Sequence, residues 1–235
     1  MTTDERLRLQ IPGGGEVSAL LARPSAPRWL LILGHGAGAG MEHTFMQSLA
    51  SELAGAGVAT LRYQFPYMEQ RRRVPDPPQL LMATVAAAVR AGAAAASGLP
   101  LLAGGKSMGG RMTSQAAAEG LLPELKGLVF FGFPLHPPKR PGTKRAEHLA
   151  KVTVPMLFLQ GTRDALADLT LLRPICTQLG RLATLHIIET ADHSFHVLKS
   201  AKRSDADVLR ELAQTTAAWA EKMKGANRNL KTEKR

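Results

Sequence analysis

The sequence predicts a single α/β domain built on a mostly parallel, twisted sheet with helices on both faces. Short apolar runs of strand length alternate with amphipathic helical segments through most of the chain, and glycine-rich turns follow several of the apolar runs. The length of 235 residues suits one domain. We place this domain at residues 1–222 and expect residues 223–235 to form a flexible basic tail.

The strands follow from apolar runs and turn residues. Residues 7–22 carry three consecutive glycines between two strand-like stretches, which predicts an antiparallel hairpin at the N-terminus. Later runs are apolar throughout, as is typical of parallel strands buried on both faces. These strands are expected at residues 29–33, 58–63, 99–103, 127–133, 154–159 and 184–188.

The helices follow from apolar residues at helical spacing. Thr44 to Gln47 fit a capping box, and so do Ser204 to Asp207 at the start of the last helix. Residues 64–78 and 134–143 are proline-rich and are expected to be loops. About twenty residues separate the strand that contains Phe130 from the strand that contains Leu157, too few for a helical lid. Helices are expected at residues 44–55, 79–96, 111–119, 167–179 and 204–223.

The charge is strongly basic, which raises the question of a nucleic-acid partner. The formal net charge is +11, but the last fourteen residues, 222–235, hold six Lys or Arg and one Glu, so these residues account for 6 − 1 = +5 of it. Aromatic residues make up only 5% of the chain, too few for an evident base-stacking surface. We therefore expect a basic surface and no nucleic-acid partner.

The compartment expected from the sequence is the cytoplasm. The N-terminus lacks the apolar segment of a signal peptide, and no apolar run reaches the ~18 residues of a membrane helix, so no membrane association is expected. The single cysteine, Cys176, lies in an apolar helical pattern and is expected to be a buried structural thiol.

The strongest chemical signal is Gly105-Lys106-Ser107-Met108-Gly109, a G-x-S-x-G sequence between an apolar strand and a helix. A serine on such a tight turn is strained, its glycine neighbours let the backbone pass, and its hydroxyl lies at the positive end of the helix. Ser107 is therefore the candidate nucleophile.

A serine hydroxyl needs a base, and in sheets with this turn an acid and then a histidine follow the serine along the chain. Asp164 and His193 each follow a predicted strand, so both lie at the carboxyl edge of the sheet. Asp168 and Asp192 are weaker alternatives for the acid, and His196 is the alternative base.

An oxyanion hole needs backbone N–H groups directed at the developing negative charge. We expect one from Met108, next to the nucleophile, and one from Ala37 in the glycine-rich turn at residues 35–40. That turn does not match G-x-G-x-x-G and no Walker lysine follows it, which disfavours nucleotide binding.

Together these residues resemble the α/β-hydrolase superfamily. The chain is most similar to lidless bacterial hydrolases related to dienelactone-hydrolase-like and testis-expressed hydrolase-like proteins, and to the hydrolase-like domain of a subunit of the NSL chromatin-acetylation complex. Some dienelactone-hydrolase-like enzymes carry a cysteine nucleophile, whereas Ser107 here favours ester chemistry. The matching segments are His35–Gly38, Phe65–Tyr67, Gly104–Arg111, Pro134–Pro138, Arg145–Leu149 and Gln160–Asp164.

The sequence thus predicts a serine hydrolase that acts on a small carboxylic ester or thioester through an acyl-enzyme, with no cofactor or metal. His35, Tyr67 and His136 are expected to contribute to substrate binding, and Arg71–Arg73 either attract an acidic substrate or form a solvated loop. The alternative is a non-catalytic module that keeps the fold and binds an acidic partner.

Overall fold

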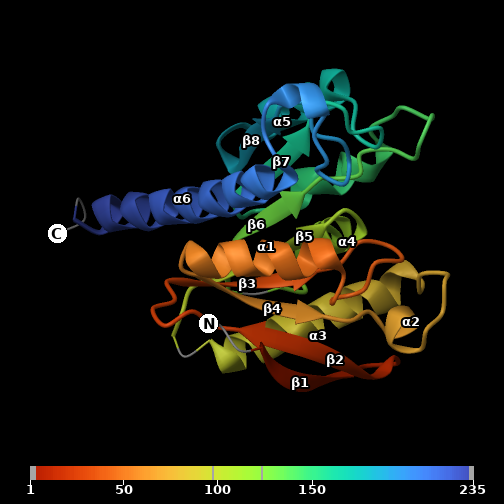
Figure 1. Ribbon diagram of the computed structural model, residues 1–235. Coiled ribbons are helices and arrows are strands. Elements are labelled where there is room, and N and C mark those ends of the chain that lie inside the picture. The colour runs from red at the N-terminus through yellow and green to blue at the C-terminus, as the bar shows by residue number, and fades with distance from the viewer. Residues whose placement is uncertain (1–3, 97, 123, 233–235) are drawn as a thin grey trace.

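The computed structural model describes residues 4–96, 98–122 and 124–232, and confirms the predicted fold. An eight-stranded sheet in the order β1-β2-β4-β3-β5-β6-β7-β8 forms the centre of the domain (Figure 1). The β1–β2 hairpin is antiparallel and pairs antiparallel with β4, while the pairs from β4 to β8 are parallel. The strands are β1 (Asp4–Ile11), β2 (Gly15–Ala22), β3 (Trp29–Gly34), β4 (Val58–Tyr63), β5 (Leu101–Lys106), β6 (Leu125–Phe131), β7 (Met156–Gly161) and β8 (Ala183–Ile188).

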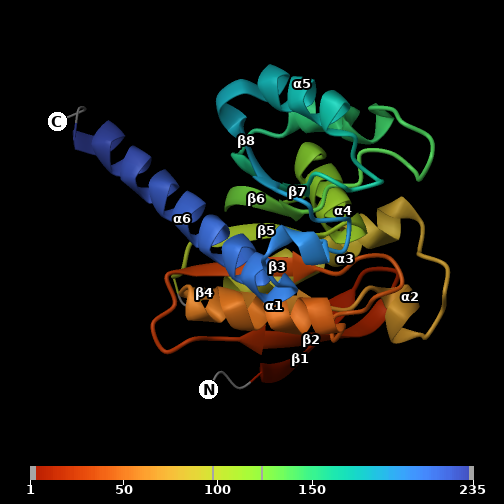
Figure 2. The same cartoon turned by 45° about the horizontal axis from the view of Figure 1, so that its top comes forward.

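Helices cover both faces of the sheet, as Figures 1 and 2 show. One core cluster joins strand residues to α1 and α6, and the other joins them to α3, α4 and α5. Residues of β3, β4 and β7 are buried throughout, which explains why these strands are mainly apolar. The helices are α1 (Thr44–Gly55), α2 (Pro66–Glu69), α3 (Pro78–Ala95), α4 (Met108–Ala118), α5 (Leu169–Leu179) and α6 (Asp205–Thr232).

The connection between β6 and β7 determines how open the carboxyl edge of the sheet is. Residues 132–155 form a loop and the 3-10 helix η1 (Lys144–Lys151), and they carry no lid domain. The expectation of a lidless domain is therefore confirmed.

The helices differ from the prediction in several places, and α4, expected at residues 111–119, already begins at Met108. The expected capping box at Thr44 is wrong, because Nδ1 of His43 accepts the hydrogen bond from the Phe45 N–H instead. The α5 helix begins only at Leu169, since the Asp168 carboxylate caps it. The loop after β4 contains the short helix α2, whose first residue is a proline. The capping box from Ser204 to Asp207 is confirmed by reciprocal hydrogen bonds.

The α3 helix bears on the expectation that no apolar run is long enough for a membrane helix. By length and composition alone it could cross a membrane. Half of it is buried inside the domain, where Leu81, Val85 and Val89 pack in the core below the sheet. We therefore interpret α3 as a core helix.

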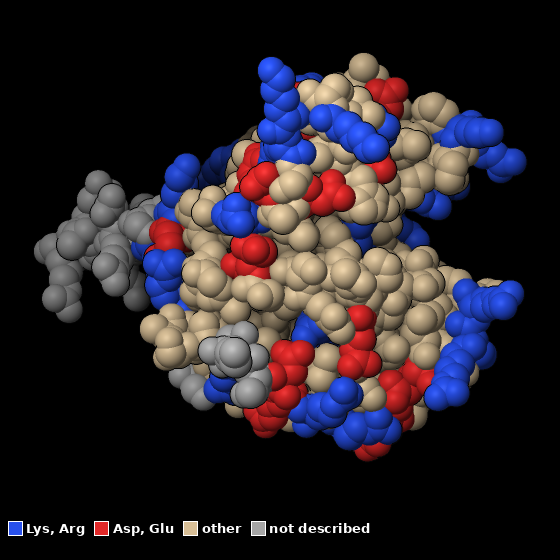
Figure 3. Space-filling view, in the orientation of Figure 1, with Lys and Arg blue, Asp and Glu red and all other residues tan. Residues whose placement is uncertain are grey.

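The charged surface and the C-terminal segment bear on the expected basic tail. Figure 3 shows Lys and Arg interspersed with Asp and Glu over the lower half of the face in view.

The α6 helix runs past residue 222 to Thr232, so no helix end marks the expected domain boundary. Residues 233–235 and the side chains of 225–232 lie outside the described residues, and the flexibility of the tail stays a prediction.

Candidate active site

Ser107 lies on a strained turn between β5 and α4. Its φ of 51° and ψ of −114° are unusual for a residue with a side chain. The flanking glycines are needed because the backbone of β3 passes close by. A Cβ at Gly105 or Gly109 would lie 2.2 or 2.4 Å from the carbonyl oxygen of Gly34. The glycines of the motif thus let the turn pack directly against the neighbouring strand.

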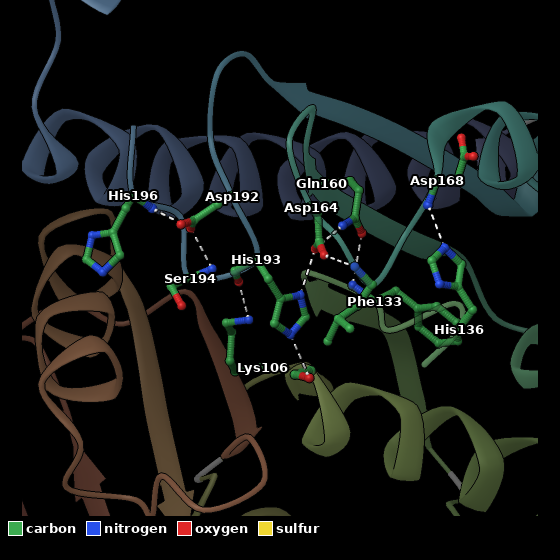
Figure 4. A network of polar contacts seen from close by, with 12 residues as sticks. Lys106, Phe133, His136, Gln160, Asp164, Asp168, Asp192, His193, Ser194 and His196 are labelled. Atoms are coloured by element: carbon green, nitrogen blue, oxygen red, sulfur yellow. Dashed lines mark hydrogen bonds and ion pairs between the residues drawn. The ribbon is translucent and has the colours of Figure 1, made fainter. Parts of the chain in front are cut away.

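A continuous hydrogen-bonded chain joins the three residues that the sequence singled out (Figure 4). Nε2 of His193 lies 2.9 Å from Oγ of Ser107, and Nδ1 lies 2.7 Å from Oδ2 of Asp164. Ser107 precedes α4, Asp164 follows β7 and His193 follows β8, so the carboxyl edge of the sheet brings them together.

Asp164 is held in one orientation by its surroundings. Its side chain is fully buried, its Oδ1 accepts from the Leu166 N–H at 2.8 Å, and its Oδ2 accepts from Nε2 of Gln160 at 2.5 Å. Oε1 of Gln160 in turn accepts from the Phe133 N–H at 2.9 Å. A buried carboxylate with this many donors is held in one position.

The alternative acid and base residues have other roles. Asp168 caps α5 with its Oδ1, and Oδ1 of Asp192 accepts from the N–H groups of Ser194 and His196 within its own loop. Nδ1 of His196 bonds the exposed Asp205 carboxylate and not a serine. None of the three contacts Ser107, and Figure 4 shows Asp168, Asp192 and His196 turned away from the His193 ring.

Lys106, directly before Ser107, reaches across to the His193 loop. Its Nζ donates to the carbonyl oxygen of His193 at 2.5 Å and lies 5.5 Å from the ring centre of Phe195. Burial lowers the pKa of Lys106 to about 8, against the opposing effect of the Asp164 and Asp192 charges. A Cβ at Gly132 would lie 3.2 Å from this Nζ and 3.5 Å from Nδ1 of His193, so the ammonium group lies beside the Asp–His pair.

The two expected oxyanion donors are the N–H of Met108, next to Ser107 in the chain, and the N–H of Ala37 in the turn after β3. Met108 is the first residue of α4, so its N–H points out of the helix end and not into the helical hydrogen-bond ladder. Ala37 is exposed in the turn after β3 and lines the same pocket as Ser107. This placement is compatible with the expected role of both N–H groups.

The structure corrects the expected substrate-binding roles of His35, Tyr67 and His136, since all three are buried and bonded to backbone. His35 accepts from the Phe65 N–H through Nε2, and burial lowers its pKa to about 4. The Tyr67 hydroxyl accepts from the Gly38 N–H. His35 and Tyr67 therefore support the turn that carries Ala37.

His136 has a similar supporting role at the other loop. Its Nε2 accepts from the Asp168 N–H at 3.1 Å and its Nδ1 bonds the Pro137 carbonyl oxygen, while only 4% of the residue is exposed. It connects the loop after β6 to the start of α5 and does not reach the pocket.

A pocket of about 750 Å³ opens beside Ser107 and His193, between the start of α1 and the start of α6. Its walls are mainly apolar, and the rings of Phe45 and Phe195 stack at a centroid distance of 5.8 Å. The apolar lining residues are Phe45, Met46, Leu166, Phe195 and Leu209. Such a pocket fits an apolar part of a small molecule next to the serine.

Metal-ligating side chains are not clustered in the part of the chain that the structure describes. Within residues 4–96, 98–122 and 124–232, no group of three or more His, Cys, Asp or Glu side chains is arranged to hold a metal ion. The buried thiol of Cys176 lies on α5, and burial raises its pKa to about 11, as expected for a structural cysteine.

Sequence reasoning missed two residues that support the site, Lys106 and Gln160. Gln160 is a fully buried polar residue in the otherwise apolar strand β7, and that interruption was the available signal. Lys106 lies inside the recognised motif, but its partner is a backbone carbonyl 87 positions along the chain, which no local pattern indicates.

Comparison with known proteins agrees with this fold. The model of the alpha/beta hydrolase domain family matches residues 27–221. A serine hydrolase without lid from Xanthomonas campestris is 20% identical, with a TM-score of 0.72 over 92% of this chain and 94% of that chain. A dienelactone hydrolase from Anabaena variabilis is 21% identical, with a TM-score of 0.72 over 93% and 96%. A serine hydrolase homologue from Coxiella burnetii is 19% identical, with a TM-score of 0.70 over 92% and 98%.

Proposed function

The chain belongs to the alpha/beta hydrolase domain family, and from this premise we propose that it is a serine hydrolase acting on a small carboxylic ester or thioester. The observation that carries the proposal is the hydrogen-bonded chain from Asp164 through His193 to Ser107, with the serine on a strained turn at the mouth of a pocket. The names of several fold neighbours, which include serine hydrolases and esterases, support the same class of reaction.

In the acylation step, Oγ of Ser107 attacks the carbonyl carbon while Nε2 of His193 takes the hydroxyl proton. The Asp164 carboxylate stabilises the imidazolium that forms and keeps Nδ1 protonated. The N–H groups of Met108 and Ala37 receive the negative charge on the carbonyl oxygen. When the tetrahedral intermediate collapses, His193 gives the proton to the departing alcohol or thiol.

In the deacylation step, water replaces the leaving group. His193 takes a proton from water, which attacks the acyl-serine carbonyl, and then returns the proton to Oγ of Ser107. The products are a carboxylic acid and free enzyme, with no cofactor needed. The open carboxyl edge lets water reach the acyl-enzyme, since residues 132–155 carry no lid.

The test is labelling of the purified protein with a fluorophosphonate, which reacts with activated serines. We expect labelling of the wild type and none of Ser107→Ala. Ser194→Ala is a matched control, because Ser194 lines the same pocket without contacting the imidazole of His193. Ester and thioester hydrolysis by the same variants should follow the labelling.

A second control separates Ser107 from the other serine–histidine pair. Oγ of Ser114 lies 2.7 Å from Nε2 of His148, but Ser114 is fully buried inside the fold and burial lowers the pKa of His148 to about 4. We expect Ser114→Ala to keep its labelling. Folded wild type that is not labelled would contradict the proposal and favour the non-catalytic interaction module.

A further inference from the structure

Two arginines lie close to each other next to the nucleophile turn without a matching acid. Arg111 is in the first turn of α4 and Arg145 is in η1. The hydrogen bond from Ser114 to His148 joins the same two elements, and each arginine lies three residues before one of these partners. Because each arginine is one turn before a member of this contact, Arg111 and Arg145 lie near each other where α4 packs against η1.

The charge of this arginine pair is not compensated. Burial and the positive charge of Arg145 both lower the pKa of Arg111, and the buried Nε of Arg111 has no hydrogen-bond partner. Among the described residues, neither arginine forms an ion pair with a carboxylate. Half-buried like charges cost stability, and so does a cation at the positive end of a helix. An anion between them would reverse both effects.

Arg111 lies near the nucleophile on α4. The Arg111 N–H donates to the carbonyl oxygen of Ser107 at 3.1 Å, so Arg111 is one helical turn from the nucleophile. Arg111 is four residues after Ser107, so the two residues lie on the same side of α4.

We propose that Arg111 and Arg145 together bind a carboxylate of the substrate whose ester or thioester carbonyl lies at Ser107. Planar guanidinium groups pair with carboxylates through two parallel hydrogen bonds, which neutral donors cannot match. The substrate class is then a half-ester of a short dicarboxylic acid or an ester with a nearby carboxylate. The apolar pocket on the α1 and α6 side takes the remaining, uncharged part.

This inference rests on the proposed function for the position of the scissile bond, so the experiment has a binding arm and a kinetic arm. In the binding arm, calorimetry measures the dissociation constants of glutarate and of inorganic phosphate. The proteins are the Ser107→Ala variant and the double variant that also carries Arg145→Gln. We expect glutarate to bind Ser107→Ala and to bind the double variant about tenfold more weakly. Tighter binding of phosphate than of glutarate, or equal binding by both variants, would overturn the carboxylate assignment.

In the kinetic arm, kcat/KM is compared for 4-nitrophenyl hemiglutarate and the uncharged 4-nitrophenyl valerate. We expect the wild type to have the higher kcat/KM for the hemiglutarate. The ratio of kcat/KM for the hemiglutarate to kcat/KM for the valerate should fall about tenfold in Arg145→Gln and in Arg111→Gln. Lys144→Gln, an exposed neighbour with the same change of charge, should keep the wild-type ratio.

The two arms separate the two proposals. Ser107-dependent hydrolysis with no charge preference and no glutarate binding overturns the carboxylate site and leaves the hydrolase intact. Glutarate binding that depends on Arg145, in a protein that hydrolyses neither ester, supports the anion site and contradicts the hydrolase.

Discussion

Asp164 carries its negative charge where solvent does not reach it, and three donors fix its two oxygens. Its value to the proposed reaction is electrostatic, because the imidazolium of His193 forms next to it. At the scale of single residues, an Asp→Asn substitution therefore tests this electrostatic role, because it removes the charge of the side chain and keeps its size.

Asp164→Asn is expected to lower kcat by about 10⁴-fold, because the amide favours the wrong tautomer of His193. The measurement is ester hydrolysis by folded protein, checked by circular dichroism. Asp168→Asn is the matched control, since its carboxylate caps α5 and does not contact His193. Equal losses in the two variants would mean that Asp164 is not the acid of the triad.

Lys106 is expected to hold the His193 loop in position, although its burial costs stability. Lys106→Met removes the bond to the His193 carbonyl, and we expect activity to fall about tenfold because the His193 loop loses a charged hydrogen bond. The measurement is kcat for a simple ester, with Lys126→Met on the exposed side of β6 as the control.

The pH dependence of stability gives a second measurement on the Lys106 variant. The folded-state pKa of Lys106 is about 8, below the unfolded value of about 10.4, so the unfolded state binds more protons between these values. The wild type should therefore gain unfolding free energy relative to Lys106→Met as the pH rises from 8 to 10. A difference that does not change with pH in denaturant titrations would show that the lysine is not desolvated.

At the scale of elements, the contact between α4 and β3 depends on backbones that touch. A Cβ at Gly109 would lie 2.4 Å from one carbonyl oxygen and 2.8 Å from the next, and both belong to backbone that cannot swing aside. The nucleophile turn can therefore form only with glycine at this position.

Gly109→Ala is expected to destabilise the fold by about 3 kcal/mol or more, as overpacking against backbone does. Gly55→Ala, in the last turn of α1 with no atom within 4 Å of the added Cβ, should instead stabilise it by about 0.5 kcal/mol. Urea unfolding of both variants checks the pair. A tolerated alanine at position 109 would mean that the turn is further from β3 than described.

At the scale of the whole molecule, one buried and one half-buried histidine make stability depend on pH. Burial lowers the pKa of His35 and of His148 to about 4, below the unfolded value of about 6.5. The unfolded state then binds more protons between these values, so stability is present above pH 6.5 and is lost as the pH falls toward 4.

We therefore expect the unfolding free energy to fall between pH 6.5 and 4, with a slope of up to about 1.4 kcal/mol per pH unit from His35. His148→Gln should have a shallower pH dependence than the wild type, because one titrating group is removed. Parallel curves of unfolding free energy against pH for the two proteins, from denaturant titrations, would contradict the lowered pKa of His148.

The cytoplasmic location expected from the sequence stays a prediction.

The sequence by itself determined the order of strands and helices and the identity of the residues that meet at Ser107. Both follow from local information: apolar runs mark strands, the glycines around Ser107 mark the turn, and parallel strands bring Asp164 and His193 to one edge.

Only the tertiary structure decided what the remaining polar residues do. His35, Tyr67 and His136 follow strands just as Asp164 does, but burial and backbone hydrogen bonds make them supports and not substrate contacts. Likewise, the bond from Lys106 to the His193 loop and the meeting of α4 with η1 join segments far apart in the chain. Such contacts depend on how loops pack, and sequence periodicity carries no information about that packing.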